Sequence, residues 1–223
     1  MTDDPVVTRC DDPDAVFARV AEVMAAAIDG ARTIHGVAHV AISGGSVVRA
    51  YALAGAELPD WRDVHVWYVD ERCVPLDDPE SNHRAARAAL EVPEVTWHPV
   101  ATDLDCDAAA AAYAEEIGDV RFDVAVNGMG PDGHTASLFP GFEQVHAEGV
   151  CVAVHGSPKP PPDRVSLTLP KLNASHRIVL AVTGAEKAPM LARVIAGPDP
   201  AVPASLLARD RLEIVADAAA LDG

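Results

Sequence analysis

The chain has 223 residues, 49% of them hydrophobic and 23% charged, a profile typical of a globular protein with a buried core. Its 34 acidic and 17 basic residues give a net charge of −17, which repels nucleic-acid backbones and anionic lipid surfaces. The sequence has no apolar run of about 18 residues or more, the length that a membrane span needs. We therefore expect no nucleic-acid partner and no membrane partner.

The N-terminal segment is acidic and lacks the apolar stretch of a secretory signal, which predicts a cytoplasmic protein. The four cysteines form no CxxC pair, so neither a zinc knuckle nor a thioredoxin-type site is indicated. Disulfide frameworks are uncommon in chains of this size without a signal peptide. We expect reduced, structural thiols at Cys10, Cys73, Cys106 and Cys151.

Helical and strand patterns alternate along the chain. Residues 13–29 have apolar side chains at helical spacing, with Asp12 as the expected N-cap and Gly30 at the C-terminal end. The pattern predicts further helices over 46–57, 81–91, 107–117 and 185–196. Short runs of apolar and β-branched residues predict strands over 36–43, 64–70, 121–130, 150–155, 176–184 and 211–217.

This alternation predicts a single α/β domain over residues 1–223, or one domain with a small appended lobe. Its core would be a doubly wound, Rossmann-like, mostly parallel sheet flanked by helices. Such sheets bind ligands outside the carboxyl ends of their strands. The residues that follow each strand are therefore the first candidates for a site.

The first strand end carries two adjacent glycines in Ser43-Gly44-Gly45-Ser46. Glycines between a strand and a helix let the backbone approach a ligand, and the helix N-terminus then offers free N–H groups to an anion. Phosphate is the commonest such anion. The alternative is an ordinary tight turn with no ligand.

The second strand end is Asp70-Glu71-Arg72, followed by Ser81. An arginine at a strand end can hold a phosphate or carboxylate with two parallel hydrogen bonds. The alternative is a salt bridge from Arg72 to Asp70 or Glu71, with Ser81 capping the next helix. The local sequence leaves both interpretations open.

The third strand end, residues 127–140, contains a formal G-x-G-x-x-G at positions 128, 130 and 133. A dinucleotide fingerprint opens the first βαβ unit and runs into a long helix. Here the motif lies in the middle of the chain and meets Pro140 and Gly141 within about two turns. We therefore interpret the match as accidental and expect no nicotinamide cofactor.

The same segment places His134 on a rigid turn at a strand end. Histidine has a pKa suited to general-base work near neutral pH. A metal site lacks partners, because His35 and His39 straddle a glycine and do not share a helix face. His134 is thus a candidate base, and no metal is expected.

The fourth candidate comprises the proline-rich segment 157–163 with Lys159, then Arg164 and Lys187. The prolines make the segment extended, either as a linker or as an ordered loop beside a site. Lys187 begins a predicted helix, where a cation opposes the helix dipole unless an anion lies nearby. A solvated surface lysine is the alternative.

Together these segments resemble the 6-phosphogluconolactonase family, within the glucosamine/galactosamine-6-phosphate isomerase superfamily. The matching stretches occur in the family's order and run from one end of the chain to the other. They are SGGS (43–46), DERCVPLDDPESN (70–82), NGMGPDGHTASLFPG (127–141), SPKPPPDRVSLTLP (157–170) and TGAEKA (183–188).

The resemblance implies hydrolysis of 6-phospho-D-glucono-1,5-lactone to 6-phosphogluconate, a step of the oxidative pentose phosphate pathway, with no metal or organic cofactor. It implies that His134 is the general base for the attacking water, with Asp132 beside it. The phosphorylated sugar lactone would be the only partner of a monomer or small homo-oligomer. The implied phosphate-binding residues are Ser43, Gly44, Gly45, Ser46, Arg72 and Lys187, with Arg164 as a candidate for the ring or the phosphate.

One departure from the family pattern is Val47-Val48, where the family usually has Thr-Pro. The threonine hydroxyl is therefore missing. We expect backbone N–H groups, Ser46 and Arg49 to hold the phosphate in its place. One neutral hydrogen bond is worth about 0.5–1.5 kcal/mol, so affinity is affected more than activity.

Three other functions remain to be weighed. Glucosamine-6-phosphate deaminases have a Phe-Asn-Glu-Pro sequence after the histidine, whereas this chain has SLFPG at 137–141. A non-enzymatic sugar-phosphate sensor would need the cations but no base, and the intact DGHTAS segment favours an enzyme. A nicotinamide-dependent oxidoreductase would have to bind its cofactor.

Overall fold

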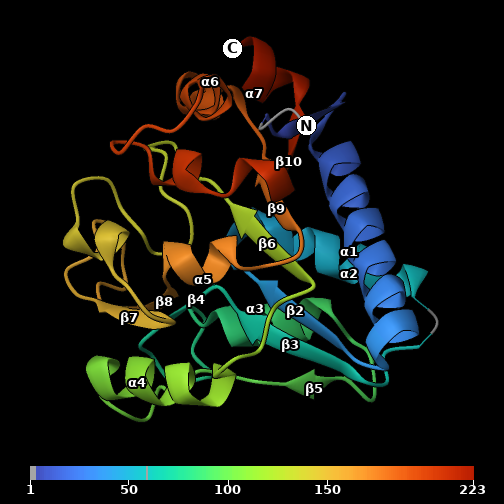
Figure 1. Cartoon of the computed structure of the whole chain (residues 1–223), viewed down its shortest axis with the longest axis vertical. Helices are drawn as coiled ribbons and strands as arrows, with labels where there is room; N and C mark the ends of the chain where they lie inside the picture. Colours follow the sequence, from blue (N-terminus) through green and yellow to red (C-terminus); the bar gives the residue numbers. More distant parts are fainter. Residues whose placement is uncertain (1–3, 59) are drawn as a thin grey trace.

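The computed structural model describes residues 4–58 and 60–223 (Figure 1). Its centre is a seven-stranded sheet in the order β1-β10-β9-β6-β2-β3-β5, in which every neighbouring pair is parallel. This arrangement confirms the predicted doubly wound α/β fold. The strands are β1 (Val6–Cys10), β2 (Ala38–Ile42), β3 (Val64–Tyr68), β5 (Thr96–Trp97), β6 (Val124–Gly128), β9 (Ile178–Val182) and β10 (Leu212–Asp217).

Two hydrophobic cores lie on the two faces of this sheet, which explains why its strands are continuous apolar runs. In β9, for example, Val179 and Ala181 point to one core, and Ile178, Leu180 and Val182 to the other. One face is covered by α1 (Pro13–His35), α2 (Val48–Glu57) and α3 (Asn82–Ala89). The other is covered by α4 (Cys106–Ile117), α5 (Leu169–Asn173), α6 (Ala188–Ala196) and α7 (Ala218–Asp222).

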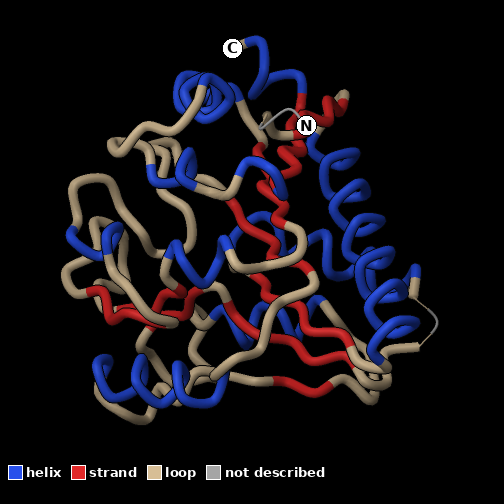
Figure 2. The backbone as a smooth tube through the Cα atoms, viewed as in Figure 1, coloured by secondary structure: helices blue, strands red, loops and turns tan. Residues whose placement is uncertain are grey.

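A second, antiparallel sheet stands apart from the first (Figure 2). Its order is β4 (Asp70–Arg72), β8 (Arg164–Leu167), β7 (Cys151–Val154). The strand expected over 150–155 therefore belongs to this sheet and not to the parallel one. The sequence pattern did not distinguish the two, because β7 is as apolar as the central strands. This small sheet brings Arg72 and Arg164 into register as neighbours.

Several element boundaries differ from the sequence-based expectation. Helix α1 continues through Gly30 to His35, and the cap is Gly36, whose φ of 78° is in the left-handed region. The helix continues through Gly30 because one glycine at an exposed helical position costs only about 1 kcal/mol relative to alanine. The edge strands β1 and β5 were not predicted, because β1 is largely exposed and β5 has only two residues. Single 3-10 turns are η1 (Gly45–Val47), η2 (Glu143–His146), η3 (Ala185–Lys187), η4 (Pro203–Leu206) and η5 (Arg209–Arg211).

Cys73 and Cys106 form a disulfide between the end of β4 and the start of α4, with their Cα atoms 5.9 Å apart. The expectation of reduced thiols is therefore wrong for this pair. The two residues are 33 positions apart, so only the packing of α4 against the small sheet brings them together. Cys10 and Cys151 are free. In the described chain no helix has the length and apolar character to cross a membrane.

Candidate active site

A cavity of about 280 Å³ opens at the carboxyl ends of β2, β6 and β9. The chain leaves β2 toward β3 and β5 on one side, but leaves β6 toward β9 and β10 on the other. Parallel sheets bind ligands where the winding reverses in this way. Every predicted site residue except Asp132 lines the cavity, and Asp132 contacts the lining residue His134; those that line it are Ser43, Gly44, Gly45, Ser46, Arg72, His134, Arg164 and Lys187.

The glycine turn after β2 is supported from behind. The buried hydroxyl of Tyr51 accepts a hydrogen bond from the Ser43 N–H (3.0 Å) and donates one to the Ser43 carbonyl (2.8 Å). A Cβ at Gly44 would lie 1.9 Å from Asn82 Oδ1, and Gly45 has a φ of 78°. Both positions therefore require glycine. The turn leads into η1, whose first N–H groups lack helical acceptors and can meet an anion, and η1 continues directly into α2.

Arg49 does not join this turn, contrary to expectation. Its guanidinium pairs with Asp14 (2.6 Å) and lies over the Phe17 ring, 4.9 Å from the centroid, both on α1. A carboxylate and an aromatic face thus hold it on the outer side of α2. Val47 lines the cavity but is buried in the core, so backbone N–H groups and Ser46 are left as the polar groups of the turn.

Arg72 forms neither of the salt bridges considered from the sequence, within the chain as described. The buried Glu71 carboxylate instead accepts from three backbone N–H groups, each at 2.7 Å, and from Ser81 Oγ at 3.0 Å. Burial raises the pKa of Glu71, while these hydrogen bonds act in the opposite direction. Ser81 caps α3 as expected. Arg72 donates to the carbonyl of Glu80, and its Nε has no partner among the described residues.

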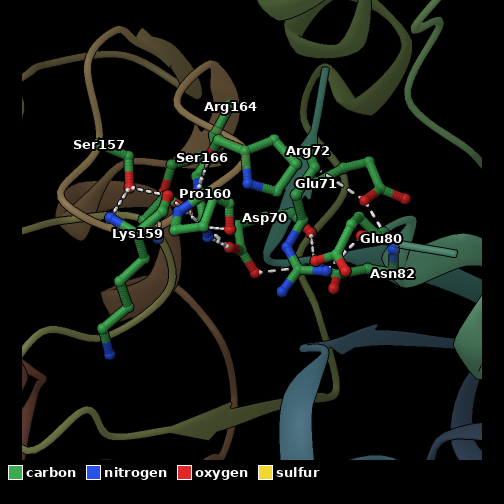
Figure 3. A network of polar contacts seen from close by, with 12 residues as sticks. Asp70, Glu71, Arg72, Glu80, Asn82, Ser157, Lys159, Pro160, Arg164 and Ser166 are labelled. Atoms are coloured by element: carbon green, nitrogen blue, oxygen red, sulfur yellow. Dashed lines mark hydrogen bonds and ion pairs between the residues drawn. The ribbon is translucent and has the colours of Figure 1, made fainter. Parts of the chain in front are cut away.

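Asp70 lines the cavity as well, although from sequence it was considered only as a partner of Arg72. Its Oδ2 accepts from Ser137 Oγ at 2.7 Å and lies 4.0 Å from Arg164 Nη1, an ion pair with both side chains under 10% exposed. Its backbone carbonyl accepts from the Asn82 side chain at 2.8 Å. Figure 3 shows Asp70 between Arg164 and Asn82. The sequence signal that could have identified Asp70 as a site residue was its position directly after the apolar run of β3.

His134 and Asp132 form a close pair beside the cavity. The His134 Nδ1 and the Asp132 Oδ1 lie 2.5 Å apart, and the imidazole is only 14% exposed. This contact assigns the proton to Nδ1 and leaves Nε2 as the basic nitrogen. Burial lowers the pKa of His134 below its ordinary value, although Asp132 acts in the opposite direction. The imidazole is therefore neutral, and able to accept a proton, at neutral pH.

The turn between β6 and His134 closes on itself. The Gly130 N–H donates to the His134 carbonyl, and the Gly133 N–H donates to the Gly130 carbonyl, each at 3.0 Å. A Cβ at Gly130 would lie 2.1 Å from the His134 ring and 2.5 Å from the Asp132 carboxylate. Glycine is therefore required where the imidazole packs on the backbone. Phe139 covers the ring, with centroids 4.6 Å apart.

The remaining cations come from two different elements. Lys187 ends η3, and Arg164 begins β8. Burial lowers the pKa of Lys187, and the positive charge of nearby Lys159 adds to this effect. Arg164 is 5% exposed and donates to the carbonyls of Lys159, Pro160 and Pro161 at 3.0–3.2 Å. Most of its donors are thus used inside the protein. Lys159, which the sequence placed in the fourth candidate without assigning it a role, also lines the cavity.

The chemistry of this site is that of general bases and fixed cations. Within the described residues, no group of three or more His, Cys, Asp or Glu side chains is placed to hold a metal ion. His39, one of the two histidines considered from sequence, accepts a hydrogen bond from the Trp67 indole at 3.1 Å. The cavity offers one neutral imidazole, several cations and a glycine turn, which suits activation of water against an anionic substrate.

Comparisons with known proteins show which family the chain is similar to. The profile of the family described as glucosamine-6-phosphate isomerases/6-phosphogluconolactonase matches residues 11–216. A 6-phosphogluconolactonase of Mycobacterium tuberculosis is 39% identical, with 87% of each chain covered. The structure of a 6-phosphogluconolactonase from Shewanella baltica superimposes with a TM-score of 0.87 at 27% identity, covering 97% of this chain and 98% of that one.

The same fold also occurs in an enzyme with a different name. A monomeric glucosamine-6-phosphate deaminase superimposes with a TM-score of 0.80, covering 96% of this chain and 98% of that one. Its sequence identity is 19%, so the likeness extends to the fold alone.

Proposed function

The chain belongs to the family of glucosamine-6-phosphate isomerases and 6-phosphogluconolactonases, and from that premise we propose that it hydrolyses 6-phospho-D-glucono-1,5-lactone to 6-phosphogluconate. One observation carries the proposal. His134, whose Nδ1 faces Asp132, lines the same cavity as Arg72, Lys187 and the glycine turn 43–46. A water-activating base and an anion site thus lie within the reach of one small phosphorylated molecule.

The phosphate would be held by charge and by backbone dipoles. The protein carries a net charge of −17, so an anionic substrate needs a local positive site. A phosphomonoester has a charge of about −1.5 to −2 at neutral pH. Arg72 and Lys187 can balance that charge, and the N–H groups after Gly45 supply hydrogen bonds without any side chain.

Ring opening begins with proton transfer from water to His134 Nε2. The water oxygen forms a bond to the lactone carbonyl carbon, and the carbonyl π electrons move onto the carbonyl oxygen. Asp132 accepts a hydrogen bond from the Nδ1–H and stabilises the imidazolium that forms. The pair is rigid because the Gly130 backbone packs against both side chains.

The intermediate then collapses to product. The alkoxide reforms the carbonyl, the bond from carbon to the ring oxygen breaks, and the imidazolium returns its proton to that oxygen. The acid product loses a proton to solvent and becomes a carboxylate. The sequence has no G-x-S-x-G nucleophile elbow, so we propose direct attack by water without an acyl-enzyme. The product would feed the oxidative pentose phosphate pathway.

The test is lactone hydrolysis by the purified chain. The lactone is generated in situ, and the product is coupled to NADP reduction by 6-phosphogluconate dehydrogenase in the presence of EDTA. Spontaneous ring opening is subtracted. His134→Ala is compared with His146→Ala, which removes an exposed imidazole that does not line the cavity.

We expect a rate well above the spontaneous one, reduced about 10²- to 10⁴-fold by His134→Ala and unchanged by His146→Ala. A wild-type rate equal to the background would refute the lactonase proposal. An active His134→Ala variant would instead refute the role of His134. Loss of activity in EDTA would contradict the proposed metal-independent reaction.

A further inference from the structure

Lys159 lies on a loop whose backbone is fixed while its side chain is left free. Its N–H donates to Ser157 Oγ at 3.2 Å, and its carbonyl accepts from Ser157 Oγ and from Arg164, each at 3.0 Å. Four prolines at 158 and 160–162 restrict the same segment. Figure 3 shows the lysine side chain extending away from this network. Within the described chain, its ammonium group forms no hydrogen bond or ion pair.

The negative charge of the phosphate can be balanced without Lys159. Asp70 lies against Arg164 and offsets its charge, and Arg164 spends its donors on the loop. Arg72 and Lys187 together match the two charges of a phosphomonoester. One cation of the cavity therefore remains for a further negative charge. Before the product carboxylate forms, the only other negative charge of the proposed reaction develops on the lactone carbonyl oxygen.

Lys159 is also the cation that acts on the catalytic pair. Burial is the largest cause of the lowered pKa of His134, and the charge of Lys159 acts in the same direction. The pKa of Asp132 is raised by burial but lowered overall by His134, with a contribution from Lys159. The other charges that act on His134 are Asp132 and Asp70. Lys159 is thus near the base as well as in the cavity.

We propose that Lys159 is a catalytic residue whose ammonium group stabilises the alkoxide formed when water attacks the lactone carbonyl. The inference rests on the proposed lactonase reaction. In the attack step, the carbonyl oxygen gains the electron pair while His134 gains the proton, so a cation must meet the new negative charge. Lys159 acts through its charge and takes no part in the proton transfer. Arg164 is then a positioning residue that holds the loop backbone.

The kinetic test separates a role at the reacting carbon from a role at the phosphate. Removing one oxyanion partner typically lowers kcat about 10²- to 10³-fold. We expect Lys159→Met to lower kcat in this range with little change in KM, and Lys159→Arg to recover part of the loss. Lys187→Met should mainly raise KM. Arg62→Met should change neither parameter. This exposed arginine lies before the amino end of β3, whereas the cavity is at the carboxyl ends of the strands.

The pH profile gives a further readout that a merely structural role would not change. Lys159 repels a proton on His134, so Lys159→Met should raise the pKa of the base. The acid limb of kcat/KM should then move to higher pH. A larger KM with unchanged kcat and an unmoved acid limb would show that Lys159 binds the phosphate, and would overturn the proposal.

Ligand binding tests the same site without turnover. 6-Phosphogluconate carries a carboxylate at the reacting carbon, whereas glucitol 6-phosphate has the same phosphate and no carboxylate. By calorimetry, Lys159→Met should weaken 6-phosphogluconate about 10-fold or more, and glucitol 6-phosphate less than about 2-fold. Equal weakening of both ligands, or of neither, would overturn the proposal.

The two proposals fail in different ways. If the wild type shows no lactone hydrolysis but Lys159→Met still loses carboxylate selectivity, the lactonase function fails and the cation site at that carbon stands. If hydrolysis is normal and insensitive to Lys159→Met, the function stands and this inference fails. Absence of both hydrolysis and binding would refute both.

Discussion

Two turns flank the point where the sheet reverses its winding, and they are built in opposite ways. The turn from Gly128 to His134 is closed by two internal backbone hydrogen bonds, and the Gly130 backbone packs closely against the imidazole. The turn from Ser43 to Ser46 is held by Tyr51 and packs against Asn82, and all four of its residues line the cavity.

The difference follows from what each turn has to do. A general base must be held in one place, so the turn that carries it is filled and closed. An anion site must keep unused donors, so its turn takes its support from outside the loop. We therefore expect changes in the first turn to alter kcat, and changes in or behind the second to alter KM.

The largest effect should come from adding a side chain at Gly130, where the backbone packs against His134. In Gly130→Ala the new methyl group would overlap His134 and Asp132 at 2.1 and 2.5 Å, so the imidazole must move. Activity should fall about as far as on loss of the base, by 10²- to 10⁴-fold. Steady-state kinetics and a crystal structure of the variant would check both parts.

Gly30→Ala is the matched control, because its methyl group would meet nothing within 4 Å on the exposed face of α1. It should stabilise the protein by about 0.4–1 kcal/mol and leave the kinetics unchanged. A Gly130→Ala enzyme with wild-type kcat would show that the close packing of this turn is not needed for catalysis.

The next largest effect concerns the open side of the cavity. Arg72→Ala removes a charged partner of the phosphate, a loss that typically costs about 2–5 kcal/mol. KM should rise accordingly while kcat changes little. The measurement is a full saturation curve for each variant, with Arg84→Ala as a control that removes an exposed arginine of α3 away from the cavity. If both variants behave alike, Arg72 does not bind the phosphate.

The smallest effect should come from a residue that supports the Ser43 turn from behind and does not itself line the cavity. Tyr51→Phe leaves the buried N–H and carbonyl of Ser43 without their partner, which costs about 1–3 kcal/mol of stability. Because the Ser43 turn then loosens, KM should also rise modestly. Urea unfolding and saturation kinetics measure the two effects.

Tyr113→Phe provides the matched case. The buried Tyr113 hydroxyl accepts from the Tyr68 N–H at 2.7 Å, but Tyr113 does not line the cavity. This variant should lose comparable stability with no change in KM. Equal KM values for Tyr51→Phe and the wild type would show that the turn does not depend on its support.

Much of the fold and site was predictable from local sequence. The alternation of apolar runs with helical patterns predicted the parallel sheet, and the family and enzyme class inferred from the motifs are confirmed by the comparisons. What failed depended on distant contacts. The run at 150–155 joined the antiparallel sheet, and Arg49 turned toward Asp14. Neither outcome has a signal within its own segment.

The amino-acid sequence by itself determined where the site would form. Glycine turns and polar residues at strand ends are local features, and parallel strands bring their carboxyl ends to one edge of a sheet. Only the tertiary structure decided which cations are free to act. Arg164 and Lys159 belong to one matching stretch, yet hydrogen bonds to the loop carbonyls occupy the arginine. Hydrogen-bond donors that are already satisfied within the protein are no longer available to a ligand, so the arginine is not free to bind substrate. The lysine takes part in the same network only through its backbone, and its ammonium group therefore remains available for substrate.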